Sequence, residues 1–192
     1  MSKPHKLKEG IISMRDTADQ QKGLRELISY VNAITLTRSL TMYEIGSYAG
    51  ESAEIFAENF KKIYCVDPWE HGYDDERDWA SHNNGEIVEN AFDARVRKYD
   101  NVVKRKIGSI DCSKDVEDNS IDLVYIDGNH KYEAILEDIK AWFPKIKTGG
   151  FLSGHDYWSE RTKKAIRDNG FYKIDQSFSD HSWVIRKGLQ TK

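Results

Sequence analysis

Residues 43–52 have the composition of a ligand-binding turn. This segment, YEIGSYAGES, joins an apolar run to a helical pattern, and its glycines Gly46 and Gly50 are four residues apart. Glycines allow a sharp turn and the close approach of a ligand, and the start of the following helix offers free N–H groups. Glu44 stands two positions before the first glycine. Its carboxylate would repel a pyrophosphate and would suit a ligand that carries an amine.

A second acid, Asp67, ends the next apolar run, 17 residues beyond Gly50. An ionised carboxylate only accepts hydrogen bonds, so its two oxygens can accept both hydroxyls of a ribose. The alternative is a turn or cap residue before Pro68. Together with Glu44, this acid predicts a site for a nucleoside that lacks phosphates and carries an amino acid. The dinucleotide fingerprint G-x-G-x-x-G is absent, which disfavours a nicotinamide enzyme.

A third group combines carboxylates with imidazoles. Asp127 follows the most apolar run of the chain, and His155 and Asp156 follow a later one. Carboxylate, imidazole and water suit Mg²⁺, Mn²⁺ or a related divalent ion. Alternatively, the acids only cap loops and hold His130 or His155 by hydrogen bonds. His130 has a side chain suited to take a proton from a substrate hydroxyl, Asp127 is the other candidate base, and a purely structural imidazole is the alternative.

These residues require a scaffold that brings distant segments together. Strand patterns cover residues 41–45, 63–66, 102–107, 121–126 and 151–153, helical patterns cover 20–34, 53–60, 86–99 and 132–143, and 171–174 with 182–185 predict a closing antiparallel ribbon. Alternation of strands and helices predicts parallel strands with right-handed crossovers. Ligands bind such doubly wound sheets at the carboxyl ends of the strands. The polar, aromatic residues 69–84 would then form a lid over the substrate, or else a solvated surface loop.

Composition narrows the function classes. The 29 Lys and Arg residues against 32 Asp and Glu, a formal net charge of −3, argue against nucleic acid as a partner. We find no apolar run of about 18 residues, so no membrane association is expected. The two cysteines form no disulfide framework, and no apolar stretch follows the charged N-terminus, so a cytoplasmic location is expected.

Five blocks together resemble a known family. The motifs EIGSYAGES, CVDPW, IDGNHKY, GG and GHDY occur in this order over about residues 40–160. They are similar to class I S-adenosylmethionine-dependent methyltransferases, and most of all to the small-molecule O-methyltransferase branch. That branch includes macrolide and aminocoumarin sugar methyltransferases and cephalosporin-hydroxylase-like proteins. Tyr48 departs from the wider superfamily, where many relatives carry a second glycine.

The resemblance implies an α/β, Rossmann-like, doubly wound fold. Its sheet would have seven mostly parallel strands with an antiparallel last strand, and helices would cover both faces. Residues 20–192 would form a single methyltransferase domain behind an N-terminal arm of residues 1–19. The N-terminal helix is also a candidate contact for a homodimer.

The resemblance also implies site residues. The cofactor S-adenosylmethionine would contact Glu44, Gly46, Ser47, Tyr48, Gly50, Ser52, Asp67, Pro68, Trp69, Ser109 and Asp127. Residues 44–50 would hold its methionine half, Asp67 its ribose and Ser109 its adenine. His130 and Asp127 would be catalytic, and Asp127, His155 and Asp156 would bind Mg²⁺ or another divalent metal. In related metal-dependent enzymes the position of His155 carries a carboxylate or an amide.

The expected reaction transfers a methyl group to a hydroxyl of a small molecule, of sugar or natural-product type. Two alternatives remain open from the sequence. One is a cofactor-binding module without turnover. The other is a hydroxylase-like member of the same family that works with a partner protein.

Overall fold

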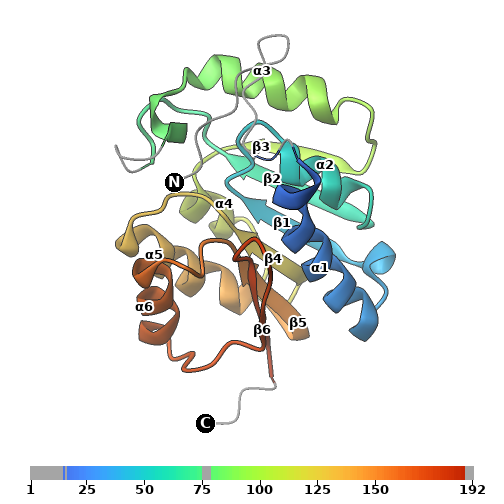
Figure 1. Cartoon of the computed structure of the whole chain (residues 1–192), viewed down its shortest axis with the longest axis vertical. Helices are drawn as coiled ribbons and strands as arrows, with labels where there is room; N and C mark the ends of the chain where they lie inside the picture. Colours follow the sequence, from blue (N-terminus) through green and yellow to red (C-terminus); the bar gives the residue numbers. More distant parts are fainter. Residues whose placement is uncertain (1–14, 16, 75–78, 189–192) are drawn as a thin grey trace.

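A seven-stranded sheet lies between two layers of helices (Figure 1). The computed structural model describes residues 15, 17–74 and 79–188. The strands are β1 (Thr41–Ile45), β2 (Lys62–Asp67), β3 (Val102–Lys106), β4 (Ile121–Ile126), β5 (Ile146–Gly154), β6 (Gln176–Ser177) and β7 (Trp183–Arg186), in the sheet order β3-β2-β1-β4-β5-β7-β6. The first five strands pair in parallel, and β7 is antiparallel to both β5 and β6. This confirms the expected mostly parallel sheet with an antiparallel last strand.

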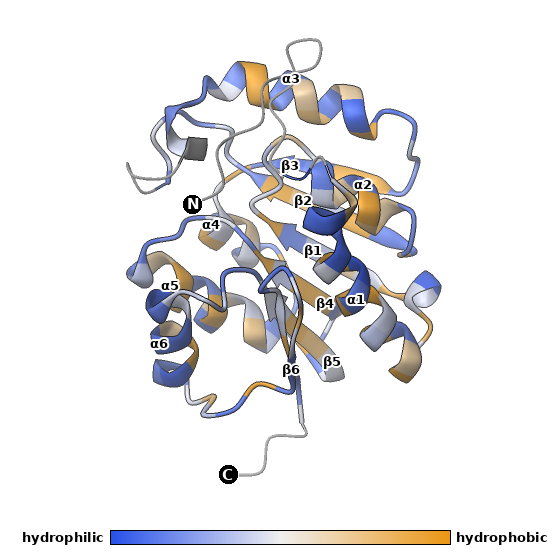
Figure 2. Ribbon diagram, viewed as in Figure 1, coloured by the Kyte–Doolittle hydropathy of each residue, from blue (hydrophilic) through white to orange (hydrophobic). Residues whose placement is uncertain are grey.

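Helices cover both faces of this sheet. They are α1 (Ala18–Ile34), α2 (Glu51–Ala57), α3 (Gly85–Val96), α4 (Ser109–Lys114), α5 (Tyr132–Trp142) and α6 (Glu160–Asp168), with short 3-10 turns η1 (Thr37–Ser39), η2 (Trp79–His82) and η3 (Phe143–Lys145). Buried residues of α1, α2 and α3 form one core with the sheet, and those of α4, α5 and α6 form a second. Apolar residues gather on the strands and on the inward faces of the helices (Figure 2). The two cores explain why β4, in the middle of the sheet, is apolar almost throughout.

The helix boundaries follow local sequence signals. Thr17 caps α1 in a capping box with Gln20, in which each side chain bonds the other residue's backbone. Asn84 accepts hydrogen bonds from two N–H groups at the start of α3. Within the described part of the chain, no helix combines the length and the hydropathy needed to cross a membrane.

The expected strand at residues 171–174 is wrong. The structure has no strand there, and the short β6 begins at Gln176. Phe171 is buried and packs edge-to-face on Phe143, with 4.8 Å between the ring centroids. The apolar residues of this segment therefore cover the second core from a loop, which gives the same local pattern as a short strand.

Candidate active site

The carboxyl ends of β1, β4 and β5 lie side by side, and the ladder of backbone hydrogen bonds continues into the turns that follow them. Gly46 N donates to Val66 O at 2.8 Å, and Asp127 N donates to Ile45 O at 2.8 Å. His155 N donates to Ile126 O at 3.0 Å. The predicted glycine turn and the predicted carboxylate–imidazole group therefore share one edge of the sheet, at its topological switch point.

The glycine turn depends on the absence of a side chain at its first glycine. Gly46 has φ +86°, and a Cβ there would lie 2.2 Å from the carbonyl oxygen of Asp127. Gly50 caps α2 with φ 82°, also in the left-handed region. Tyr48 adopts φ 44° without being glycine, and Asp156 adopts φ 59°. Such strained backbone concentrates at functional sites, which supports this edge as the site.

Glu44 is fully buried beneath the turn. Its Oε2 accepts a hydrogen bond from Ser47 Oγ at 2.7 Å, and burial raises the pKa of its carboxyl to about 7. Ser52 and Ser47 lower this pKa, but by less than burial raises it. Among the described residues, no donor meets Glu44 Oε1 in hydrogen-bonding geometry. An orphaned buried acceptor is costly, and an amine on a ligand would satisfy it.

Asp67 holds the turn together at the end of β2. Its Oδ2 accepts from Tyr48 N at 2.9 Å and its Oδ1 accepts from Trp69 N at 2.7 Å, while burial raises its pKa. Asp67 therefore does act as a turn and cap residue, which was the alternative that the sequence left open. Each carboxylate oxygen has a second lone pair, so the ribose role stays compatible with this geometry. Trp69, directly after Pro68, is buried and donates its indole N–H to Tyr48 O at 2.8 Å, which makes it part of the scaffold.

Ser109 begins α4 at the end of the neighbouring strand β3. Its hydroxyl donates to Asp138 and accepts from Trp142 Nε1 at 2.9 Å, all within the protein interior. Burial raises the pKa of Asp138 to about 7. The Ser109 side chain is thus committed to internal partners. Within the sequence of the expected lid, Tyr73 has a phenol whose pKa burial raises to about 12.

Asp127, His130, His155 and Asp156 converge at the carboxyl ends of β4 and β5. His130 Nε2 lies 2.9 Å from Asp156 Oδ2 and 3.8 Å from Asp127 Oδ1. His155 Nδ1 lies 3.2 Å from Asp156 Oδ1 and 3.6 Å from Asp127 Oδ1. The structure thus brings together four residues that sequence reasoning placed at neighbouring strand ends.

Three residues of this cluster could together bind a metal ion, and one of them differs from the predicted set of ligands. Asp127, His130 and Asp156 offer ligand atoms that all lie within 4.8 Å of one another. The sequence predicted His155 in place of His130. Carboxylate and imidazole donors of this kind fit a divalent cation.

Asp74, which sequence reasoning did not single out, contacts both the backbone N–H and the imidazole of His130. Its Oδ1 accepts from His130 N at 2.7 Å, and its Oδ2 lies 2.5 Å from His130 Nδ1. Asn129 also donates its side-chain amide to Tyr73 O at 2.7 Å. The described part of the predicted lid therefore contacts the loop after β4, whereas residues 75–78 lie outside the described residues. Asp74 is one of several acids in this polar segment, and nothing in the local sequence distinguishes the one that reaches His130.

The neighbouring carboxylates favour the protonated forms of the two imidazoles. Burial alone would lower the pKa of His130, but close contacts to Asp156 and Asp74 and the nearby carboxylate of Asp127 raise it well above its usual value. The pKa of His155 is also raised, because the charge of Asp127 and a hydrogen bond to Asp156 outweigh its burial. Asp156 has a lowered pKa for the reciprocal reason. This arrangement favours the protonated form of His130, which cannot itself accept a proton.

Arg15 is the second functional residue that sequence reasoning missed. Its Nη2 lies 2.8 Å from Asp127 Oδ2 and its Nη1 lies 3.2 Å from Asp180 Oδ2, with 12 % of the side chain exposed. Its backbone N–H donates to Glu51 Oε1 at 3.1 Å. A residue of the expected N-terminal arm therefore joins the carboxylate–imidazole cluster. No local signal could have found it, because its partners are 112 and 165 residues away.

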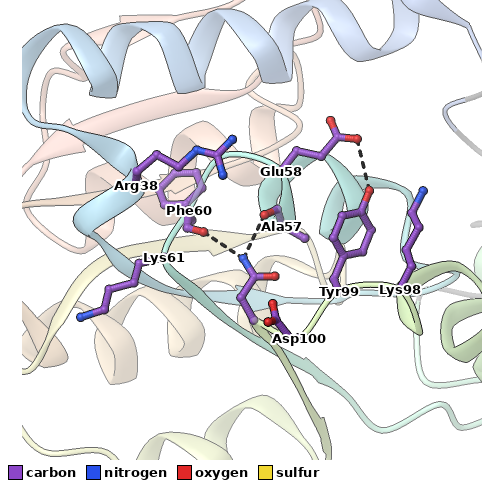
Figure 3. Close-up of a pocket in the computed structure, with 9 residues that line it drawn as sticks. Arg38, Ala57, Glu58, Phe60, Lys61, Lys98, Tyr99 and Asp100 are labelled. Atoms are coloured by element: carbon purple, nitrogen blue, oxygen red, sulfur yellow. Dashed lines mark hydrogen bonds between the residues drawn. The ribbon is translucent and has the colours of Figure 1, made fainter.

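An open pocket elsewhere carries no comparable chemistry. It is lined by Arg38, Ala57, Glu58, Phe60, Lys61, Lys98, Tyr99, Asp100 and Asn101 (Figure 3). Asn101 donates its amide to Ala57 O and Phe60 O, both at 2.9 Å. These residues precede β2 and β3, so the pocket lies at the amino edge of the sheet, opposite the carboxylate–imidazole cluster.

Comparison with known proteins agrees with this geometry. Residues 43–157 match the family described as "Methyltransferase domain". An uncharacterized protein of Acanthamoeba polyphaga mimivirus is 26% identical over 137 residues, which are 66% of this chain and 58% of that protein. A shorter match of 57 residues covers only 6% of an uncharacterized protein of Sinorhizobium fredii. The chain therefore spans at most 58% of the length of these curated relatives.

Solved structures share the fold. The O-methyltransferase NovP superposes with a TM-score of 0.61 at 16% identity, over 88% of this chain and 79% of that one. Phosphoethanolamine N-methyltransferase 1 of Haemonchus contortus, solved with S-adenosylhomocysteine, superposes with a TM-score of 0.54 at 11% identity, over 77% of this chain and 27% of that one. The sheet, the strand-end site and the family match together show that the chain belongs to this methyltransferase family.

Proposed function

We propose that this chain is an S-adenosylmethionine-dependent O-methyltransferase that acts on a hydroxyl of a small molecule, with a divalent cation at Asp127, His130 and Asp156. One observation carries the proposal: the carboxylate–imidazole cluster lies beside the glycine turn, at adjoining strand ends. Donor and acceptor would then meet in one crevice. The O-methyltransferase NovP, which shares this fold, supports the choice of a hydroxyl acceptor.

The residues present fit the proposed cofactor. Glu44 Oε1 is a buried acceptor that lacks a donor among the described residues, and it suits the amine of the methionine half. Asp67 keeps one lone pair on each oxygen for ribose hydroxyls. Gly46 leaves open the space that a Cβ would occupy. When bound, this cofactor supplies a methyl group on a positively charged sulfur.

The cluster would prepare the acceptor hydroxyl. A hydroxyl must lose its proton at or before attack, so a base has to stand near it. His130 can take that proton only after it has lost its own, and Asp127 stays ionised because His155, His130 and Arg15 lower its pKa against the effect of burial. With a divalent cation held by Asp127, His130 and Asp156, His130 would bind it as the neutral imidazole, a nearby hydroxyl would have a lowered pKa, and the ionised Asp127 would accept the hydroxyl proton. Asp127 and Asp156 would then orient the acceptor.

Calorimetry with S-adenosylhomocysteine tests the cofactor half of the proposal. We expect Asp67→Asn to weaken binding by about 10- to 100-fold, because hydrogen bonds to a charged acceptor are lost. Asp118→Asn is the matched control, since Asp118 is an exposed acid that pairs with Lys145 before β4. Thermal unfolding of each variant checks that the turn still folds. A folded Asp67→Asn protein with unchanged affinity would refute the ribose assignment.

The metal half needs a separate measurement. We expect Mn²⁺ to bind the wild-type protein and Asp156→Asn to lose that binding while its affinity for S-adenosylhomocysteine persists. Release of S-adenosylhomocysteine from S-adenosylmethionine, measured with alcohols and with amines, then tests the acceptor class. Turnover with amines alone would contradict the hydroxyl assignment, and cofactor binding without turnover on any acceptor would favour a non-catalytic module.

A further inference from the structure

Arg15 connects the N-terminal part of the chain to two carboxylates. Its Nη2 lies 2.8 Å from Asp127 Oδ2 and its Nη1 lies 3.2 Å from Asp180 Oδ2, while 12% of its side chain is exposed. The backbone of Arg15 is held as well, because its N–H donates to Glu51 Oε1 at 3.1 Å and its carbonyl oxygen accepts from Gln21 Nε2 at 3.0 Å. The guanidinium is therefore fixed beside the carboxylate–imidazole cluster.

The two carboxylates that Arg15 contacts have different surroundings. Asp180 Oδ1 accepts a hydrogen bond from Ser182 N at 2.8 Å, within the turn that leads into β7. Helix α1 packs directly on this carboxylate, since a Cβ at Gly23 would lie 2.1 Å from Asp180 Oδ1. Asp180 is thus an anchor that is held independently of the cluster. Asp127, in contrast, is one of the proposed metal ligands.

Asp127 is shared between Arg15 and the proposed metal site. Its Oδ2 faces the guanidinium, whereas its Oδ1 lies 3.8 Å from His130 Nε2 and 3.6 Å from His155 Nδ1. The guanidinium already supplies a charge-assisted hydrogen bond to this carboxylate. A divalent cation held by Asp127, His130 and Asp156 would add two positive charges at the same group. Positive charges that share one largely buried carboxylate repel each other, because their surroundings screen them less than water does.

We propose that Arg15 is an internal counter-ion that competes with the divalent cation for Asp127. Docking of Arg15 then weakens metal binding, and bound metal weakens the docking of Arg15 by the same factor, because coupling between two sites is reciprocal. The proposal rests on the proposed metal site and names a regulation of that site. As the site takes up metal, Arg15 loosens from Asp127 and keeps Asp180 as its anchor.

Calorimetry with Mn²⁺ on the full chain at pH 7 measures this competition. We expect Arg15→Gln to bind Mn²⁺ about tenfold more tightly than the wild type, which corresponds to ~1.4 kcal/mol. Arg15→Lys keeps the positive charge and should stay closer to the wild type than Arg15→Gln does. Arg25→Gln is the matched control and should bind like the wild type, because Arg25 is 52% exposed and lies 3.9 Å from Glu58.

Thermal unfolding of the same proteins, in EDTA and in saturating Mn²⁺, measures the reciprocal effect. A ligand that binds the native state raises the melting temperature by an amount that follows its affinity. If Arg15→Gln binds tenfold more tightly, Mn²⁺ should raise its melting temperature by roughly 3–6 °C more than it raises that of the wild type. The same unfolding curves identify a temperature at which every variant is folded, and the calorimetry is done there.

A double variant locates the ion. Arg15→Gln combined with Asp156→Asn should lose the added affinity, because Asp156 belongs to the proposed ligand set. Tight Mn²⁺ binding that survives in the double variant would place the ion elsewhere and would overturn the competition for Asp127.

Three further results would overturn the counter-ion role and leave the metal site in place. Affinity in Arg15→Gln within twofold of the wild type, or weaker than it, would show that Asp127 serves Arg15 and the metal at the same time. Equal tightening in Arg15→Lys and Arg15→Gln would show that charge is not the cause. If neither the wild type nor Arg15→Gln binds Mn²⁺, the proposed metal site itself fails, and the competition fails with it.

Discussion

Removing the guanidinium of Arg15 should destabilise the protein far more than removing an exposed arginine. In Arg15→Gln, two largely buried carboxylates, Asp127 and Asp180, lose a cationic partner at 2.8 Å and 3.2 Å. Breaking a buried ion pair on one side costs about 3 kcal/mol or more, because the remaining charge is left uncompensated. For a chain of this size that loss lowers the melting temperature by roughly 6–12 °C.

Arg25→Gln is the matched control for this experiment. Arg25 lies 3.9 Å from Glu58 with 52% of its side chain exposed, so its pair should contribute less than about 1 kcal/mol. The assay is thermal and urea-induced unfolding of both variants beside the wild type. A loss of stability in Arg15→Gln no larger than in Arg25→Gln would refute the buried pairing of Arg15 with Asp127 and Asp180.

The pH dependence of the same comparison provides a second check. The folded protein lowers the pKa of Asp127, with Arg15 as one cause, so this contribution to stability is present above the unfolded pKa of about 4. It is lost as pH falls through the folded pKa. The difference in unfolding free energy between wild type and Arg15→Gln should therefore be large at pH 7 and should shrink in acid. A difference that is constant across this range would contradict the ion-pair explanation.

Two other substitutions examine the turn and the imidazole. Gly46→Ala should destabilise the fold and abolish binding of S-adenosylhomocysteine, since its Cβ would lie 2.2 Å from Asp127 O; unchanged unfolding and calorimetry would contradict this. Asp74→Asn should lower the pKa of His130, because a carboxylate that raises it loses its charge. Titration of the imidazole C–H signals by nuclear magnetic resonance measures this shift. Because the fold raises the pKa of His130, this group's contribution to stability is fully present below pH ~6.5 and is lost as pH rises through the folded pKa. Asp74→Asn should weaken this pH dependence of the unfolding free energy. A pH profile identical to that of the wild type would argue against the contact between Asp74 and His130.

Local sequence patterns were sufficient for the architecture. Alternating apolar and helical segments predicted the parallel sheet, and the position of residues directly after strands predicted that Asp127, His155 and Asp156 would meet. Parallel strands place their carboxyl ends at one edge, so strand-end residues are close in space whatever their separation along the chain. The same patterns failed at residues 171–174, since a loop that covers a core can have the apolar content of a strand.

Only the tertiary structure decided which groups touch within the site. It placed His130 rather than His155 in the metal-capable trio, and it bonded Asp74 to that imidazole. It also brought Arg15 to Asp127 across 112 residues. The physical reason is that the period of a strand or helix determines which face a side chain takes, whereas ion pairs depend on loop paths and on the summed charge around each group.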